Sequence, residues 1–126
     1  MPIPTGRPVY LNLVRIKLPV AGIMSIVHRV TGVVMVLVMP PVVYLLDLSL
    51  RDSGGFQLAR DLVNSLVGTA VLFLMLWALV HHLLAGIRYL LIDVDVGVEK
   101  PHYGYSALAV LAASPLVAAL LLGALL

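Results

Sequence analysis

The sequence has no cysteine, and it is poor in charge. Without cysteine, the chain itself cannot form disulfides, thiolate-ligated zinc sites, cysteine-ligated iron–sulfur clusters or covalent c-type haem, so any metal would depend on histidine or carboxylate. Charged residues make up 11% of the chain, and its eight lysines and arginines exceed its six aspartates and glutamates by two. These cations are too scattered for a nucleic-acid surface, and we expect no nucleic-acid partner.

Hydrophobic residues, in contrast, make up 62% of the sequence, and the mean hydropathy is +1.11. Both values lie far outside the range of soluble domains and indicate an integral membrane protein in contact with the lipid bilayer. Runs free of charged residues cover 30–46, 62–80 and 102–126. A helix needs about 20 apolar residues to cross the hydrocarbon core. We therefore predict an all-α membrane protein with three transmembrane helices in one transmembrane domain, residues 1–126.

The residues that flank these runs set the expected boundaries. Pro19 precedes the first helix, and Pro40 and Pro41 inside it should bend it, because proline lacks an amide donor and clashes with the preceding turn. The stretch DLSLRDSGGFQLARD has two glycines and mixed charge, so we interpret it as a short solvent-facing connection. We expect an N-terminal segment at 1–19 and helices at about 20–48, 62–92 and 104–126.

The cations beside the spans predict how the chain is oriented. With three spans, the N-terminus and the second loop lie on the same side, where five lysines and arginines stand against two on the other side. The positive-inside rule then places the N-terminus in the cytoplasm. The N-terminal segment lacks the apolar core of a cleavable signal peptide, and no transit peptide rich in Arg and Ser precedes Arg7, so we expect the inner (cytoplasmic) membrane of a bacterium. The inner-side cations are Arg7, Arg15, Lys17, Arg88 and Lys100, and the outer-side cations are Arg51 and Arg60.

Two of the predicted helices carry a polar stripe. Residues three, four and seven apart share one face of a helix, and both stripes follow this spacing. The adjacent histidines His81 and His82 are turned about 100° from each other, so they cannot face the same ligand. His82 also lies eleven residues, or roughly 16 Å of helix rise, before Asp93 at the inner end, which takes it towards mid-membrane. The first stripe is Ser25, His28, Arg29 and Gly32, and the second is His82, Gly86, Tyr89 and Asp93.

These stripes fit two kinds of electron-transfer ligand. A neutral imidazole near the membrane centre suits axial coordination of haem iron, which makes His82 a candidate ligand. Haem propionates would then seek cations nearer the interface, at the depth of His28, Arg29 and Arg88. Alternatively, a serine and an arginine beside a carboxylate-bearing helix could hydrogen-bond a quinone carbonyl and polarise it as it takes up electrons and protons, a role open to Ser25 with Arg29.

Other interpretations stay open at this point. The histidine pair with Arg88 could act as a relay in a small proton-coupled transporter or channel subunit, and a haem-free structural anchor could pack the same histidines. Arg29 and Asp93 could snorkel or pair with each other, while Thr31 is expected to bond back to a carbonyl of its own helix. A glycine one turn from a histidine, such as Gly32 or Gly86, could serve close helix packing or leave room for a flat cofactor.

Three motifs go beyond periodicity: RPVYLNL, SIVHRVTG and HLLAGIRYLLID. Together they resemble the cytochrome b subunit of succinate dehydrogenase, one of the two membrane anchor chains of succinate:quinone oxidoreductase, which is respiratory complex II and part of the tricarboxylic acid cycle. The resemblance spans the N-terminal segment and the first two helices, and the third helix has no motif. It implies electron transport to ubiquinone or menaquinone, in a subunit that does not itself oxidise succinate.

The resemblance also implies roles for single residues. It matches His82 to the axial iron ligand of haem b and His28 to a histidine beside the haem propionates. It matches Ser25 and Arg29 to the ubiquinone site, and it matches Asp93 to a carboxylate that helps to order that site.

The same resemblance implies partners. The chain would form half of a heterodimeric haem-binding anchor bundle, in which the second membrane anchor subunit supplies the other axial haem ligand. An iron–sulfur subunit would deliver electrons to the quinone site, and a flavoprotein subunit would oxidise succinate. Tyr89 departs from the family pattern, since relatives often have histidine at this position, so the resemblance supports no propionate role there.

Overall fold

The computed structural model describes residues 17–126, which form four helices and no strand. The helices are α1 (Val20–Arg51), α2 (Ser53–Asn64), α3 (Leu66–Asp93) and α4 (His102–Leu125). Within the described residues, α1, α3 and α4 are long and apolar enough to cross a membrane, so the prediction of an all-α protein with three spans is confirmed. Most of the expected segment 1–19, including Arg7 and Arg15, lies outside the described residues.

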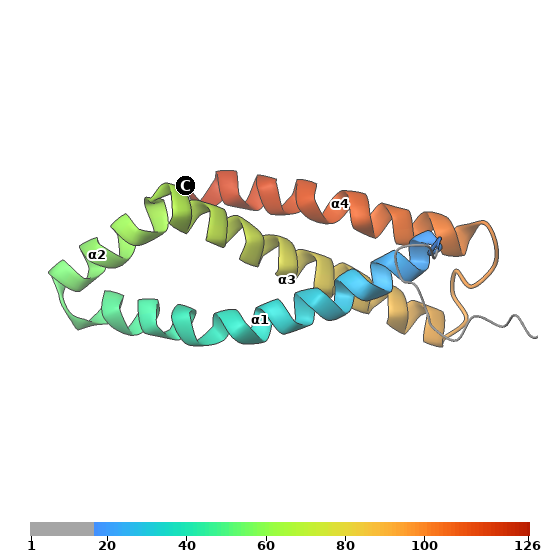
Figure 1. Cartoon of the computed structure of the whole chain (residues 1–126), viewed down its shortest axis with the longest axis horizontal. Helices are drawn as coiled ribbons and strands as arrows, with labels where there is room; N and C mark the ends of the chain where they lie inside the picture. Colours follow the sequence, from blue (N-terminus) through green and yellow to red (C-terminus); the bar gives the residue numbers. More distant parts are fainter. Residues whose placement is uncertain (1–16) are drawn as a thin grey trace, which may run out of the picture.

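The three long helices form an elongated bundle in which α3 contacts both α1 and α4 (Figure 1). The start of α1, the end of α3 and the start of α4 lie at one end of the bundle. The short helix α2 and the C-terminus lie at the other end (Figure 1). Both polar stripes therefore run from the first end, which the charge bias predicts to be the inner one, towards the middle of the bundle.

Helix α1 begins where the sequence places its start. Pro19 is extended, and its carbonyl accepts hydrogen bonds from the backbone N–H groups of Gly22 at 2.8 Å and Ile23 at 3.1 Å. The helix continues through Pro40 and Pro41 and follows a curved path (Figure 1). A missing amide donor and a crowded turn are ordinary causes of such curvature.

The stretch interpreted as a solvent-facing connection is instead mostly the helix α2. The side chain of Asp52 caps this helix by accepting a hydrogen bond from Gly55 N–H at 2.7 Å. The two glycines that suggested a turn occupy the first helical turn, where this cap offsets part of their low helix propensity. Packing also favours a helix here. The apolar residues at helical spacing face α1 and the C-terminus, and Ala59 is buried; they are Phe56, Ala59 and Val63.

A second cap separates α2 from α3. Ser65 is extended, and its hydroxyl oxygen accepts a hydrogen bond from Gly68 N–H at 3.0 Å. The helix expected at 62–92 therefore starts at Leu66, and the helix expected at 104–126 starts earlier, at His102. These shifts leave the polar stripes on the helices to which the sequence assigned them.

The buried core lies where α1, α3 and α4 meet. It consists of Ala21, Met24, Ala85 and Ala107, against which Tyr89 and other partly buried side chains pack. Small residues let helix backbones approach closely, which is how helices pack in a membrane that offers no hydrophobic drive between them. Most of the larger apolar side chains point outward and are exposed. The surface of the bundle is thus suited to lipid or to further helices.

Candidate functional site

The imidazole of His82 reaches across from α3 to the backbone of α1. Its Nδ1 lies 3.0 Å from the carbonyl oxygen of His28. A carbonyl oxygen can only accept a hydrogen bond, so Nδ1 must carry the proton and act as the donor. In the neutral ring, Nε2 then holds a lone pair. This is the protonation state that a metal-ligating histidine adopts when its other nitrogen donates to a backbone carbonyl.

The side chain of His28 stacks on the same imidazole. The two ring centroids are 4.0 Å apart with an angle of 17° between the planes. On its other side, His28 meets the ring of Tyr89 edge to face, with centroids 5.3 Å apart. Its Nε2 is buried and has no hydrogen-bond partner among the described residues. A buried donor or acceptor without a partner costs free energy, so His28 is suited to a polar ligand group that reaches it.

Glycine makes the close approach of these rings possible. A Cβ atom on Gly32 would lie 3.0 Å from Cε1 of His82, closer than side chains normally pack, and 3.5 Å from its Nδ1. A Cβ on Gly86 would lie 4.0 Å from Nε2 of His28, an ordinary contact distance. The group that approaches Gly32 in the structure is the His82 ring, and room for a flat cofactor beside Gly32 stays a prediction.

Thr31 also contacts the His82 imidazole, a contact that was not predicted from the sequence. Its hydroxyl donates to the His28 carbonyl at 2.9 Å, as expected for a threonine bonding back along its own helix. The same oxygen lies 3.4 Å from Nδ1 of His82, and the residue is fully buried. Its spacing of three from His28 was a signal that it shares that face, but only the packing of α1 on α3 reveals the contact.

His81 faces a different side of α3 from His82, as the rotation of about 100° between neighbouring helix positions requires. It is fully buried, and its Nδ1 lies 3.1 Å from the hydroxyl of Ser114 in α4. The ring of Trp77 lies 6.0 Å away, centroid to centroid. His81 therefore joins α3 to α4 and takes no part in the cluster around His82.

Arg88 is also directed at α4. Its Nε donates to the Ser106 hydroxyl at 2.9 Å, and its Nη2 donates to the Tyr103 carbonyl at 2.8 Å. The guanidinium carbon lies 4.6 Å from the centre of the Tyr103 ring, a cation–π contact. Only Nη1 remains without a hydrogen-bond partner among the described residues. The structure thus does not bring the guanidinium into the His28–His82 cluster, and its propionate role stays a prediction.

The three residues predicted for a quinone site lie nearer the end of the bundle. Ser25 is half-buried in α1, Arg29 is exposed one turn later, and Asp93 is exposed as the last residue of α3. Arg29 and Asp93 form no ion pair with each other in the part of the chain that the structure describes. An ion pair between Arg29 and Asp93 therefore does not explain why these two charged residues are present. Their side chains remain available to a ligand or to a partner chain.

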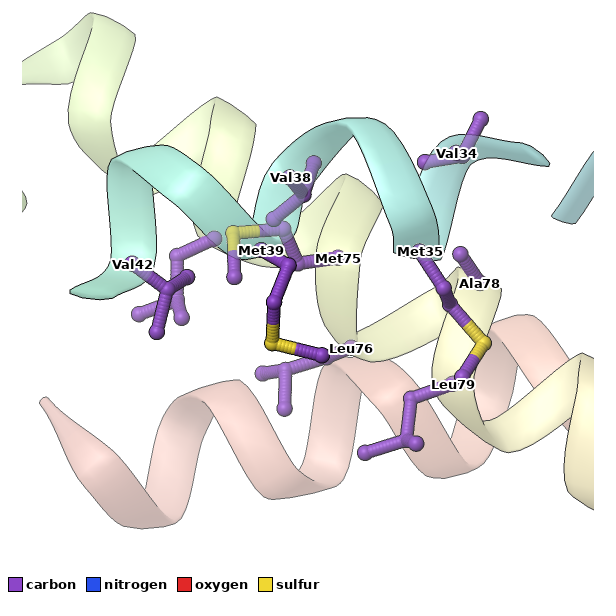
Figure 2. Close-up of a pocket in the computed structure, with 10 residues that line it drawn as sticks. Val34, Met35, Val38, Met39, Val42, Met75, Leu76, Ala78 and Leu79 are labelled. Atoms are coloured by element: carbon purple, nitrogen blue, oxygen red, sulfur yellow. The ribbon is translucent and has the colours of Figure 1, made fainter. Parts of the chain in front are cut away.

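Beyond the polar cluster, the space between α1 and α3 is apolar. A groove of about 220 Å³ lies between α1 and α3, and residues such as Val34, Met35, Met39, Met75 and Leu79 line it (Figure 2). None of its lining side chains can donate or accept a strong hydrogen bond. Between α1 and α3, hydrogen-bonding side chains are consequently found at the histidine cluster and not in this groove.

A metal ion bound by side chains alone is not supported. Residues 17–126 contain no group of three or more histidine, cysteine, aspartate or glutamate side chains placed to hold one ion. Iron within a porphyrin has a different requirement, because the macrocycle supplies the equatorial ligands and the protein need supply only axial ones. A single histidine with a bare Nε2 fits that requirement.

Comparison with known proteins agrees with this chemistry. Residues 4–122 match the family described as the succinate dehydrogenase/fumarate reductase transmembrane subunit. The chain belongs to this family. Among its relatives is the succinate dehydrogenase cytochrome b556 subunit of Paracoccus denitrificans, which is 35% identical over 117 residues, or 93% of this chain and 90% of the relative. The subunit of the same name from Coxiella burnetii is 36% identical over 110 residues, covering 86% of this chain and 87% of the relative.

Family membership confirms the resemblance carried by the motifs. The match extends over almost the whole chain, including α4, which has no motif of its own. A succinate dehydrogenase/fumarate reductase transmembrane subunit works within a larger complex, so this chain is a multi-pass membrane subunit with partners. The exposed apolar faces of the three spans are consistent with that setting.

Proposed function

We propose that this chain is the cytochrome b subunit of a succinate:quinone oxidoreductase, where it binds haem b and helps to form the quinone-reduction site. The observation that carries the proposal is the His82 ring, whose Nδ1–H is held by the His28 carbonyl at 3.0 Å and whose Nε2 is thereby left to bind iron. When bound, haem supplies a one-electron redox centre within the membrane. A second membrane anchor subunit would supply the other ligand to the haem iron.

The propionate side of the proposed site lies towards the inner end. His28 supports it through a buried Nε2 that has no partner among the described residues. Arg29, the next residue, brings an exposed cation. Arg88 can contribute only through Nη1, because its other donors are engaged by α4. We therefore assign the propionate interactions first to His28 and Arg29.

In the proposed quinone site, the Ser25 hydroxyl and the Arg29 guanidinium donate hydrogen bonds to one quinone carbonyl oxygen. These donors stabilise the negative charge that develops on that oxygen as electrons arrive. Asp93 helps to order the site from the end of α3. Reduction to the quinol consumes two electrons and two protons. The electrons come from succinate through the flavoprotein and iron–sulfur subunits on the cytoplasmic side of a bacterial inner membrane, and the protons come from the aqueous phase on that side.

Haem content tests the ligand assignment directly. In the purified complex, His82→Ala should abolish the haem b signal in a pyridine haemochrome spectrum, because the substitution removes the nitrogen proposed to bind the iron. His102→Ala, which removes an exposed histidine at the start of α4, is the matched control and should leave haem content unchanged. Full haem content in His82→Ala would refute this ligand assignment.

The spectrum of the unaltered complex separates the proposal from its alternatives. A Soret band that shifts on reduction with dithionite is expected. A complex without that band would favour a haem-free structural anchor. Ion or solute flux in liposomes without haem absorbance would favour a transporter or channel subunit.

A further inference from the structure

The plane of the His82 ring is set from outside its own helix. The torsion that turns an imidazole about its Cβ–Cγ bond is broad and roughly two-fold, so α3 alone does not fix that plane. Among residues 17–126, the polar and stacking contacts around the ring come from a single segment of α1, residues 28–32. The orientation of the ring therefore depends on α1.

Two residues in this segment lie against neighbouring atoms of the ring. The Thr31 hydroxyl lies 3.4 Å from Nδ1 and also donates to the His28 carbonyl at 2.9 Å, so it engages both members of the hydrogen bond that holds the proton on Nδ1. Gly32 faces Cε1, where a Cβ would lie only 3.0 Å away. Thr31 thus holds the polar edge of the ring, and the bare backbone of Gly32 sets how far the ring can turn towards α1.

We propose that Thr31 and Gly32 are positioning residues for the His82 imidazole, fixing its ring plane and the hydrogen bond from its Nδ1. This inference rests on the proposed function, since it concerns His82 as the haem ligand. A hydrogen bond from the non-ligating nitrogen changes the basicity of an axial imidazole, and such outer partners tune the metal that it binds. Neither residue touches iron in this arrangement, so both act through His82.

Electron paramagnetic resonance of the oxidised complex provides the readout. The largest g value of a low-spin ferric haem depends on the angle between its two axial imidazole planes, and a change in ligand basicity moves the midpoint potential. Thr31→Val keeps the shape of the side chain and removes the hydroxyl, and it should shift both quantities while haem remains bound. Thr31→Ser retains the hydroxyl and should restore values close to those of the unaltered protein.

Gly32→Ala tests the second contact. The added methyl group should turn the ring and shift the largest g value. Gly123→Ala and Gly104→Ala are matched controls, because an added Cβ at either position meets no atom within 4 Å, and both should give unaltered spectra. If Gly32→Ala prevents assembly, the comparison of Thr31→Val with Thr31→Ser decides the proposal.

The outcomes separate this inference from the proposed function. Full haem content in His82→Ala, or no haem in the unaltered complex, would overturn the proposed function. A second outcome would overturn only the positioning role. In that outcome His82→Ala loses haem, as expected, but Thr31→Val has the same g values and midpoint potential as the unaltered protein. A shift in Thr31→Val that Thr31→Ser does not reverse would also count against it, because loss of the hydroxyl would not then be the cause.

Discussion

Inside a membrane-spanning bundle, a polar side chain without a partner costs several kcal/mol, because no water is present to replace the missing hydrogen bond. His81, His82 and Arg88 follow one another along α3, and each one finds its partner on a neighbouring helix. His81 and Arg88 turn towards α4, whereas His82 turns towards α1. Contacts with α4 and contacts with α1 are thereby divided between different faces of one helix.

Loss of a quinone-site donor should separate two activities of the complex. Ser25→Ala should lower the rate of succinate:quinone reductase by about 10²-fold, the usual cost of removing a hydrogen-bond donor to a developing oxyanion. Oxidation of succinate with an artificial soluble electron acceptor should remain normal, because that reaction does not use the membrane site. Both rates are measured on the same preparation of the complex.

Arg29→Leu should reproduce this separation, and the exposed Arg60→Ala at the other end of the bundle is its control. Normal quinone reduction in both Ser25→Ala and Arg29→Leu would remove these two residues from the quinone site. An equal decrease in both activities would point to loss of assembly instead.

For single residues, helical periodicity predicted which adjacent side chains point in different directions, but it did not predict which helix each side chain contacts. It predicted that His81 and His82 face different ways and that Thr31 bonds to its own helix, and the structure agrees on both points. It did not predict the contact between Thr31 and His82, or the hydrogen bonds of Arg88 to α4. Such contacts depend on how one helix is rotated against another, and a single stripe of residues does not determine that rotation.

Among the helices, α2 is distinctive because one of its faces is apolar while the other is polar. Ala59 and Val63 face the bundle, whereas Leu58 and Leu62 are exposed on the adjoining part of the apolar face. A helix of this kind at the end of a membrane bundle is suited to lie in the interface between lipid and water. Its position beside the end of α1 and the start of α3 agrees with that setting (Figure 1).

The first turn of α2 should depend on its cap. Asp52→Ala removes the acceptor for Gly55 N–H and should destabilise the helix by about 1 kcal/mol. The amides of that turn should then exchange with deuterium faster, as measured by hydrogen-exchange mass spectrometry of the complex in detergent. Asp52→Asn keeps a capping oxygen and should retain most of the protection. Equal exchange in all three proteins would show that packing, and not the cap, holds this turn.

The sequence predicted the long helices well and missed the short one for a physical reason. Proline, charge and twenty or so apolar residues define a membrane span locally, so the start of α1 at Val20 agrees with the expected start. The glycine pair Gly54 and Gly55 ordinarily indicates a turn. In α2 the Asp52 cap and contacts with α1 outweigh that tendency, and such contacts are visible only in three dimensions.

For the whole molecule, the small buried core is the main feature. Alanines and one methionine fill the crossing of the three spans, and the large side chains face outward. Composition alone predicted an integral membrane protein, and the motifs predicted its family. The arrangement of the helices around α3 could not be predicted from composition, because small residues occur on several faces of each span.

Because the chain has no cysteine, single introduced cysteines can be labelled selectively to measure its orientation in the membrane. Single-cysteine variants Gln57→Cys in α2 and Glu99→Cys between α3 and α4 place exposed thiols at opposite ends of the bundle. In intact cells, a membrane-impermeant maleimide should label Gln57→Cys only. Glu99→Cys should react after the membrane is opened, with labelling of the unfolded protein as the reference for full reactivity. The reverse pattern would place the N-terminus outside the cytoplasm.

The hydrogen bond between His82 and the His28 carbonyl has a consequence for the order of biogenesis. In an isolated α3, either ring nitrogen can carry the proton, and no α1 carbonyl is present to hold it on Nδ1. The tautomer with a bare Nε2 is selected when α1 docks, because the acceptor belongs to the α1 backbone. For the proposed haem ligand, docking of α1 on α3 therefore comes before selection of the tautomer with a bare Nε2.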